Sequence, residues 1–193
     1  MRIITGKAKG TRLYTLEGED VTRPTTERVK EAIFSMIQFE IEGRRILDLF
    51  AGSGQLGLEA MSRGAEYVMF VDSSRDAMGI VKKNAEKTHL FDKCGYLVTD
   101  YRSYLRKNGG EGKFDVVFLD PPYKSECMSD ALVKLHEYRI IKTGGMCVCE
   151  SEDADLFDRI DGLADRYEIV KKNGYGRVQI ALLRPKYEEA CDE

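Results

Sequence analysis

The chain has 193 residues and a mass of 21.9 kDa, with 42% hydrophobic and 33% charged residues. This composition excludes a disordered chain, a collagen-like fibre and a disulfide-stapled miniprotein, and it predicts one globular domain. The mean hydropathy is −0.38, and no run approaches the ~20 apolar residues of a membrane span. The five cysteines form no Cys-x-x-Cys pair and no export signal is evident, so we expect reduced thiols in a cytoplasmic protein.

The net charge of −3 is unevenly distributed along the chain. Residues 150–168 hold eight acids and two arginines, a local charge of −6, so the remainder of the chain sums to +3. The first 12 residues contain Arg2, Lys7, Lys9 and Arg12 and no acid. This basic segment is open to two interpretations, a phosphate-binding arm or a solvated hairpin.

In chain order, the first 15 residues alternate like a short hairpin, and Pro24 then opens a helix with one apolar face. Strands are predicted at Ile46–Phe50, Tyr67–Asp72, Tyr96–Thr99, Phe114–Asp120 and Met146–Cys149, with helices at Gln55–Arg63, Asp76–Lys87 and Ser129–Tyr138. Apolar strands separated by helices indicate a parallel sheet covered on both faces. Two final strands, Tyr167–Lys171 and Arg177–Leu183, are joined by five residues and should be antiparallel.

A glycine-rich turn follows the first of the strands that alternate with helices. Gly52, Gly54 and Gly57 have the spacing of the dinucleotide fingerprint, and Asp72 ends the next strand 20 residues after Gly52. Two ligands fit, a nicotinamide dinucleotide or S-adenosylmethionine, and a turn with a purely structural role is the third interpretation. Asp48 favours S-adenosylmethionine, because the sulfonium and ammonium groups of that ligand attract a carboxylate. The pyrophosphate of a dinucleotide would repel it.

The tetrapeptide Asp120-Pro121-Pro122-Tyr123 ends the fourth of these strands, where ligand chemistry occurs in open α/β sheets. The prolines fix the backbone and leave carbonyl oxygens and the Asp120 carboxylate as a rigid set of acceptors. Such acceptors can orient an exocyclic amino group of a base toward a methyl donor, and Tyr123 offers a stacking face. These four residues are the predicted catalytic segment, and a rigid turn without function is the alternative.

Together these segments resemble a known family. Asp48–Gly54 and Asp120–Tyr123 are similar to class I S-adenosylmethionine-dependent amino-methyltransferases. Residues 2–10 and 23–34, with Tyr175-Gly176-Arg177, resemble the bacterial RsmD family of 16S ribosomal RNA guanine-N2 methyltransferases. The resemblance implies a Rossmann-like α/β fold with a mostly parallel seven-stranded sheet, an antiparallel last strand and helices on both faces. It also implies S-adenosylmethionine as methyl donor and 16S rRNA or the small ribosomal subunit as partner.

The resemblance further implies roles for individual residues. The expected cofactor-binding residues are Asp48, Phe50, Gly52, Gly54, Asp72, Ser73, Asp100 and Tyr101. Among these, Asp48 and Gly52 would line the methionine part and Asp72 the ribose, while Asp100 and Tyr101 would meet the adenine. The expected RNA-binding residues are Lys7, Lys9, Arg12, Arg23, Thr25 and Arg28. The last three have a second interpretation, covering the cofactor, and an ion pair with Glu31 would explain Arg28 equally well.

Other polar residues receive less weight. Asn84 matches a helix position of the family and is expected to be structural, while Glu150 is a weaker candidate for the border of the site. His89 and His136 lack partners at ligand spacing, so no metal site is expected. We divide the chain into an N-terminal hairpin and helix extension (1–40), the methyltransferase domain (41–186) and an acidic tail (187–193).

Three alternative functions remain open. N6-adenine methylation of DNA or RNA would use the same Asp-Pro-Pro-Tyr acceptors. An NAD-dependent dehydrogenase fits the glycine turn but leaves Asp120–Tyr123 unexplained, and a binding module would keep the fold without catalysis. No membrane, metal or obligate protein partner is expected, and the sequence does not distinguish free RNA from an assembled subunit as the substrate.

Overall fold

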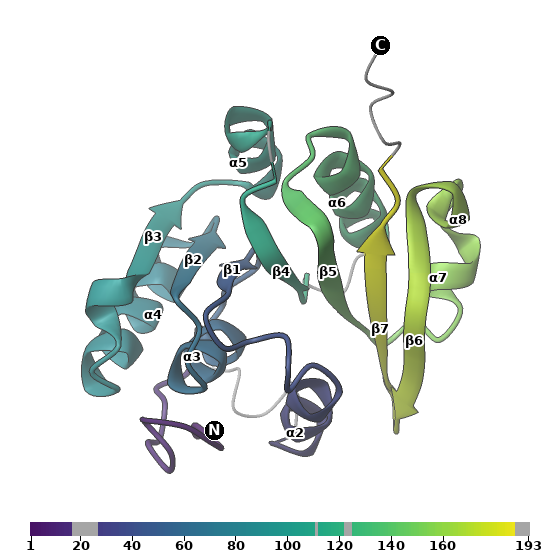
Figure 1. The fold of residues 1–193 in the computed structure, drawn as a ribbon. Coiled ribbons are helices and arrows are strands. Elements are labelled where there is room, and N and C mark those ends of the chain that lie inside the picture. The colour runs from purple at the N-terminus through teal and green to yellow at the C-terminus, as the bar shows by residue number, and fades with distance from the viewer. Residues whose placement is uncertain (17–26, 111, 122–124, 188–193) are drawn as a thin grey trace.

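The computed structural model describes residues 1–16, 27–110, 112–121 and 125–187, and Figure 1 shows them as helices around a central sheet. The sheet has seven strands in the order β3-β2-β1-β4-β5-β7-β6. Their bounds are β1 (Arg45–Asp48), β2 (Tyr67–Asp72), β3 (Cys94–Val98), β4 (Phe114–Leu119), β5 (Ile141–Ser151), β6 (Tyr167–Tyr175) and β7 (Val178–Pro185). Strands β1 to β5 pair in parallel, and β7 is antiparallel to both of its neighbours. The predicted fold is therefore confirmed.

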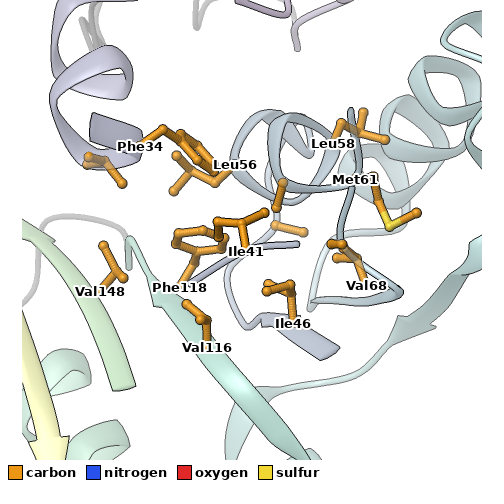
Figure 2. Packing of buried hydrophobic residues seen from close by; sticks show 14 of the residues in the cluster. Phe34, Ile41, Ile46, Leu56, Leu58, Met61, Val68, Val116, Phe118 and Val148 are labelled. Atoms are coloured by element: carbon orange, nitrogen blue, oxygen red, sulfur yellow. The ribbon is translucent and has the colours of Figure 1, made fainter. Parts of the chain in front are cut away.

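Helices cover both faces of the sheet because side chains of successive strand residues point to opposite faces. On one face, α2 (Glu27–Met36), α3 (Gln55–Ser62) and α4 (Arg75–Lys87) pack with strand residues such as Ile46, Val116 and Phe118. Figure 2 shows Phe34 of α2 and Leu56, Leu58 and Met61 of α3 beside the strand residues of this cluster. The other face carries α5 (Tyr101–Asn108), α6 (Ser125–Glu137), α7 (Leu156–Arg159) and α8 (Leu163–Arg166). Cys147 and Cys149 are buried there, as their alternation on a strand predicts.

Several parts of the fold differ from the sequence prediction: α7 and α8 were not predicted, and β5 begins at Ile141, five residues before the predicted Met146. The helix α5 was also not predicted, because it is short and mainly polar and only Tyr104 and Leu105 of its eight residues are buried. The final hairpin is longer than predicted, since Tyr175 pairs with Val178 and only two residues connect β6 to β7. Polar residues along β6 hide this extension in the sequence. The predicted helix start at Pro24 lies outside the described residues, and the described part of α2 begins at Glu27.

The N-terminal segment, residues 1–16, is a hairpin that packs against α3. Arg2 and Arg12 form an isolated antiparallel β-bridge, and Ile3 donates its N–H to the Thr11 carbonyl at 2.9 Å. The Lys7 N–H donates to the Ser62 carbonyl of α3 at 2.8 Å. Gly6 has φ +86°, and a Cβ there would lie 1.8 Å from the Ser62 oxygen, so only glycine permits this approach. The segment is therefore docked through backbone hydrogen bonds and the buried side chains of Ile3, Ala8 and Leu13. Lys7, Lys9 and Arg12 are exposed.

A fully buried ion pair lies beneath this segment. The Lys30 ammonium of α2 lies 3.3 Å from Glu59 Oε2 of α3 and donates to the Arg2 carbonyl at 2.6 Å. Glu59 also accepts the N–H groups of Ile4 and Thr5, at 2.7 and 3.0 Å. Burial lowers the pKa of Lys30 although the Glu59 charge opposes the change. These contacts join the segment to two helices and leave Lys30 inaccessible to a macromolecular ligand. No helix in the described part of the chain is long and apolar enough to span a membrane.

Candidate active site

The glycines of the turn between β1 and α3 have two different structural roles: one permits close packing and another leaves space for a ligand. Gly52 and Gly54 have positive φ angles of 53° and 78°, which most other residues rarely adopt. A Cβ at Gly52 would meet no atom within 4 Å, so this side of the turn is open to a ligand. A Cβ at Gly57 would instead lie 2.3 Å from the Phe70 ring. Gly57 therefore permits close packing of α3 on β2, and Gly52 leaves room at the site.

Asp48 is the last residue of β1 and is almost completely buried. Its Oδ2 accepts the Gly57 N–H at 3.0 Å. Burial, helped by the charges of Asp120 and Asp72 and opposed by the Gly57 hydrogen bond, raises the pKa of Asp48 to about 7. The carboxyl groups of Asp72 and Asp120, at the ends of β2 and β4, are therefore near enough to Asp48 for their charges to act on it. A cationic ligand group placed there would reduce their mutual repulsion.

Asp72 ends β2 and holds the glycine turn from the side. Its Oδ2 accepts the Gly52 N–H and its Oδ1 accepts the Ser74 N–H, both at 2.8 Å. Each carboxylate oxygen has a second lone pair, so both can still accept a hydrogen bond from a hydroxyl group of a bound ligand. Ser73 is exposed beside it, and Ser74 caps α4 by accepting the Ala77 N–H.

Asp100 and Tyr101 lie just beyond the end of β3. Asp100 is exposed and caps α5, and the hydrogen bond that it accepts from the Ser103 N–H lowers its pKa. The Tyr101 ring packs on Phe50 with centroids 5.2 Å apart, and its hydroxyl donates to Asp130 Oδ2 of α6 at 2.8 Å. The structure thus brings Phe50 and Tyr101 together as an aromatic pair. The Asp100 carboxylate already accepts the Ser103 N–H, and the Tyr101 hydroxyl already donates to Asp130.

The predicted catalytic segment is described only in part. Asp120 follows β4 directly and is half-buried, as is Pro121, while Pro122 and Tyr123 lie outside the described residues. Phe118, two residues before Asp120, pairs with Asp48 across the neighbouring strands β4 and β1. This register brings Asp120 close to Asp48 and explains why the charges of the two carboxyl groups interact. On the next strand, Glu150 is buried one residue before β5 ends.

Of the predicted RNA-binding residues, Lys7, Lys9, Arg12 and Arg28 are exposed, whereas Arg23 and Thr25 lie outside the described residues. No ion pair within residues that the structure describes engages any of these four, so the alternative pairing of Arg28 with Glu31 is not formed. The described residues also contain no group of three or more His, Cys, Asp or Glu side chains suited to a metal ion.

Sequence reasoning missed the buried pair of Lys30 and Glu59. The signal was present, since Glu59 is the only charged residue in the otherwise apolar run Leu56–Met61. A charge inside such a run is expected to have a buried partner. The identity of that partner, on a helix earlier in the chain, requires the tertiary structure.

The residues at the site fit S-adenosylmethionine. The acid cluster around Asp48 suits a cationic sulfonium and ammonium group, and the free lone pairs of Asp72 suit a ribose diol. The open side of the turn at Gly52 leaves space for such a ligand to reach the backbone.

Comparisons with known proteins agree with this fit. The family described as conserved hypothetical protein 95 matches residues 1–184. The Bacillus subtilis protein named "Putative rRNA methyltransferase YlbH" is 37% identical over 188 residues, covering 96% of this chain and 100% of its own. Ribosomal RNA small subunit methyltransferase D of Haemophilus influenzae is 34% identical, covering 79% of each chain. The solved structure described as "Putative methyltransferase yhhF from Escherichia coli" superimposes with a TM-score of 0.83 at 26% identity, covering 97% of this chain and 99% of that one. These relatives are named as methyltransferases and not as dehydrogenases.

Proposed function

We propose that this chain, which belongs to the RsmD/YlbH family of S-adenosylmethionine-dependent methyltransferases (conserved hypothetical protein 95), methylates the exocyclic N2 of a guanine in 16S ribosomal RNA. The observation that carries the proposal is the position of Asp120-Pro121 at the carboxyl end of β4, within electrostatic reach of Asp48 at the end of β1. This arrangement puts a rigid set of acceptors beside the residues that suit the methyl donor.

S-adenosylmethionine supplies a methyl group already activated by its sulfonium, so the protein needs no nucleophile of its own. Asp48 and Gly52 contact its methionine part, and Asp72 accepts hydrogen bonds from the ribose hydroxyls. Asp100 and Tyr101 meet the adenine, and Phe50, Gly54 and Ser73 complete the lining. Phe50 supports Tyr101 by packing on its ring.

On the acceptor side, the Asp120 carboxylate and the Pro121 carbonyl orient the guanine amino group. The amino lone pair is delocalised into the base, and its two N–H groups, donating to these acceptors, would turn the lone pair toward the methyl carbon as the nitrogen pyramidalises. The N–C bond would form as the S–C bond of the methyl donor breaks, and the nitrogen would lose one proton to water. The contribution of the protein is therefore alignment and electrostatic stabilisation. Pro122 and Tyr123 complete the segment, with Tyr123 as a stacking face for the base.

The target base must be unpaired or flipped, because a base inside a helix cannot reach the methyl donor. The assignment to 16S rRNA rests on the name of the Haemophilus influenzae relative, and the exposed basic groups of the N-terminal segment are consistent with a phosphate-rich substrate.

The test is methyl transfer in vitro followed by mass analysis of the digested nucleosides. Purified protein is incubated with S-adenosylmethionine and with either naked 16S rRNA or assembled small subunits from a strain lacking the gene. We expect more N2-methylguanosine in one of these substrates than in the same substrate incubated without the protein, and a much smaller increase with Asp120→Ala. An increase in N6-methyladenosine instead would overturn the guanine assignment, and no increase in any methylated nucleoside in either substrate would overturn the assignment to 16S rRNA.

A further inference from the structure

Asn84, in the third turn of α4, is completely buried and holds two distant parts of the chain. Its Nδ2 donates to the Ser53 carbonyl and to the Tyr14 carbonyl, each at 2.9 Å. Its Oδ1 accepts the Tyr14 N–H at 2.7 Å. One amide therefore holds both backbone groups of Tyr14, near the end of the N-terminal segment, and also a carbonyl of the glycine turn.

The contact with Ser53 places Asn84 at the cofactor side of the molecule. Ser53 lies between Gly52 and Gly54, and the turn is closed by a hydrogen bond from the Gly54 N–H to the Ala51 carbonyl at 2.7 Å. Asp72 holds the Gly52 N–H from β2, while Asn84 holds the Ser53 carbonyl from α4. The conformation of the turn is therefore fixed by two side chains, and only Asn84 also contacts the N-terminal segment.

The chemistry of the amide explains why asparagine occupies this position. Asparagine is a weak helix former, and a buried amide is unfavourable unless its polar atoms are paired. Here both the donor and the acceptor atoms are paired. A carboxylate would lack the donors for the two carbonyls, and a hydroxyl could not reach three backbone groups.

We propose that Asn84 is a positioning residue that couples the N-terminal segment to the cofactor turn. A bound cofactor that orders the turn strengthens the hold of Asn84 on Tyr14, and a docked segment in turn strengthens cofactor binding, since coupling between two sites is reciprocal. Because Lys7, Lys9 and Arg12 lie on the same segment, RNA contact there and cofactor binding favour each other. This last step rests on the proposed function, whereas the coupling itself requires only that the turn binds S-adenosylmethionine.

Ser62 offers a matched control, because it anchors the same segment without contacting the turn. Its Oγ donates to the Thr5 carbonyl at 2.6 Å and accepts the Ala8 N–H at 3.0 Å. Like Asn84 it is buried. Ser62→Ala therefore removes two buried hydrogen bonds to the segment and leaves the link between Tyr14 and Ser53 intact.

The first measurement uses the unaltered protein and needs no RNA. Hydrogen exchange at the Tyr14 amide reports directly on its bond to Asn84. We expect saturating S-adenosylmethionine to slow this exchange at least about fivefold, which corresponds to a coupling of about 1 kcal/mol. Unchanged exchange at this amide in protein saturated with the cofactor would overturn the proposal.

The second measurement compares variants by calorimetry. Asn84→Ala is expected to raise the Kd for S-adenosylmethionine about tenfold, the effect of about 1.4 kcal/mol, and to abolish the slowing at Tyr14. Ser62→Ala lowers the thermal midpoint but keeps the Kd within about twofold and retains the slowing. If both variants lose thermal stability and neither changes the Kd, Asn84 is merely structural and the proposal is wrong. If Asn84→Ala does not fold, Asn84→Ser provides the same comparison.

Failure of the coupling is distinguishable from failure of the proposed function. An unaltered Kd in the Asn84 variants overturns the coupling and leaves methylation of 16S rRNA untouched, because no RNA is present. An unmodified chain that does not bind S-adenosylmethionine would overturn both.

Discussion

Replacing Asp48 with asparagine is expected to stabilise the cofactor-free protein at neutral and higher pH, and to weaken its binding of S-adenosylmethionine. The carboxyl is buried at the end of β1, and burial raises its pKa from the usual 3.8 to about 7. Asparagine keeps the size of the side chain, and its carbonyl oxygen can still accept the Gly57 N–H that now lies 3.0 Å from Oδ2. The substitution therefore removes the charge with little change in packing.

The size and sign of the effect follow from this pKa. The difference between 3.8 and about 7, at about 1.36 kcal/mol per pKa unit, means that the ionised carboxyl destabilises the folded state by about 4 kcal/mol. Because the folded state holds the proton more tightly, the unfolded chain ionises first as the pH rises above about 4. This group therefore makes the protein progressively less stable up to about pH 7, and the loss is constant above that.

Urea unfolding of both proteins between pH 5 and 8 measures the effect. The stability advantage of Asp48→Asn should grow by about 2–3 kcal/mol across this range. Asp130→Asn is the control, because the pKa of Asp130 is shifted in the opposite direction. Hydrogen bonds from Arg102 and Tyr101 lower it although burial opposes them. That group is ionised in both states over this range, so its difference from the unaltered protein should not vary with pH. If the difference in unfolding free energy between Asp48→Asn and the unaltered protein does not vary with pH, the raised pKa of Asp48 is refuted.

The same carboxyl connects cofactor binding to pH. A cationic ligand group next to Asp48 favours its ionised form, so binding below about pH 7 should release a proton. Calorimetry at pH 6 in two buffers of different ionisation enthalpy would count this proton. We expect release approaching one proton for the unaltered protein and none for Asp48→Asn, together with weaker binding by the variant. Equal proton release by both proteins would contradict a contact between Asp48 and the cation.

Three further substitutions test the remaining roles. Asp72→Ala removes the proposed ribose acceptor and should weaken S-adenosylmethionine binding by roughly 1.5–3 kcal/mol in calorimetry; unchanged affinity would exclude that role. Asp120→Ala should lower kcat severely while cofactor affinity falls less, because its acceptor acts most strongly in the transition state; the reverse pattern would make Asp120 a cofactor residue. Changing Lys7, Lys9 and Arg12 together to alanine should flatten the log–log salt dependence of RNA binding by up to about two to three units and leave cofactor affinity unaltered; an unchanged slope would exclude the segment as the RNA contact.

The central strands of the sheet, such as β1 and β4, could be predicted from the sequence because they are buried on both faces and are therefore almost continuously apolar. Tyr67–Asp72 was predicted with its observed bounds, and the other strands within a few residues except where polar residues extend them. The extensions of β5 and β6 escape notice for that reason, and α5 escapes because its stabilisation comes from the Asp100 cap and two buried residues. Local patterning records burial, so elements with little buried surface leave little signal.

The candidate site could be predicted as a set of residue types at strand ends, but its electrostatics could not. Asp48 and Asp120 are 72 positions apart in the chain, and only the neighbouring placement of β1 and β4 brings their charges together. Likewise, Asn84 matches a structural helix position in the sequence, and its link between Tyr14 and Ser53 emerges only from the packing of α4. Contacts between distant segments depend on topology, which sequence patterns specify only coarsely.

The topology also explains how a chain of net charge −3 can bind a polyanion. The acid-rich stretch 150–168 includes α7 and α8, whose Leu156, Phe157 and Leu163 pack on one face of the sheet. The N-terminal segment packs on the opposite face, and Figure 1 shows it far from α7 and α8. Screening limits electrostatic repulsion to about one Debye length, ~8 Å at physiological salt, so acids across the sheet would have little effect on RNA bound at the N-terminal segment, as we propose. Under the proposed function, the exposed basic groups of the N-terminal segment, and not the sum over the chain, therefore govern the approach of the substrate.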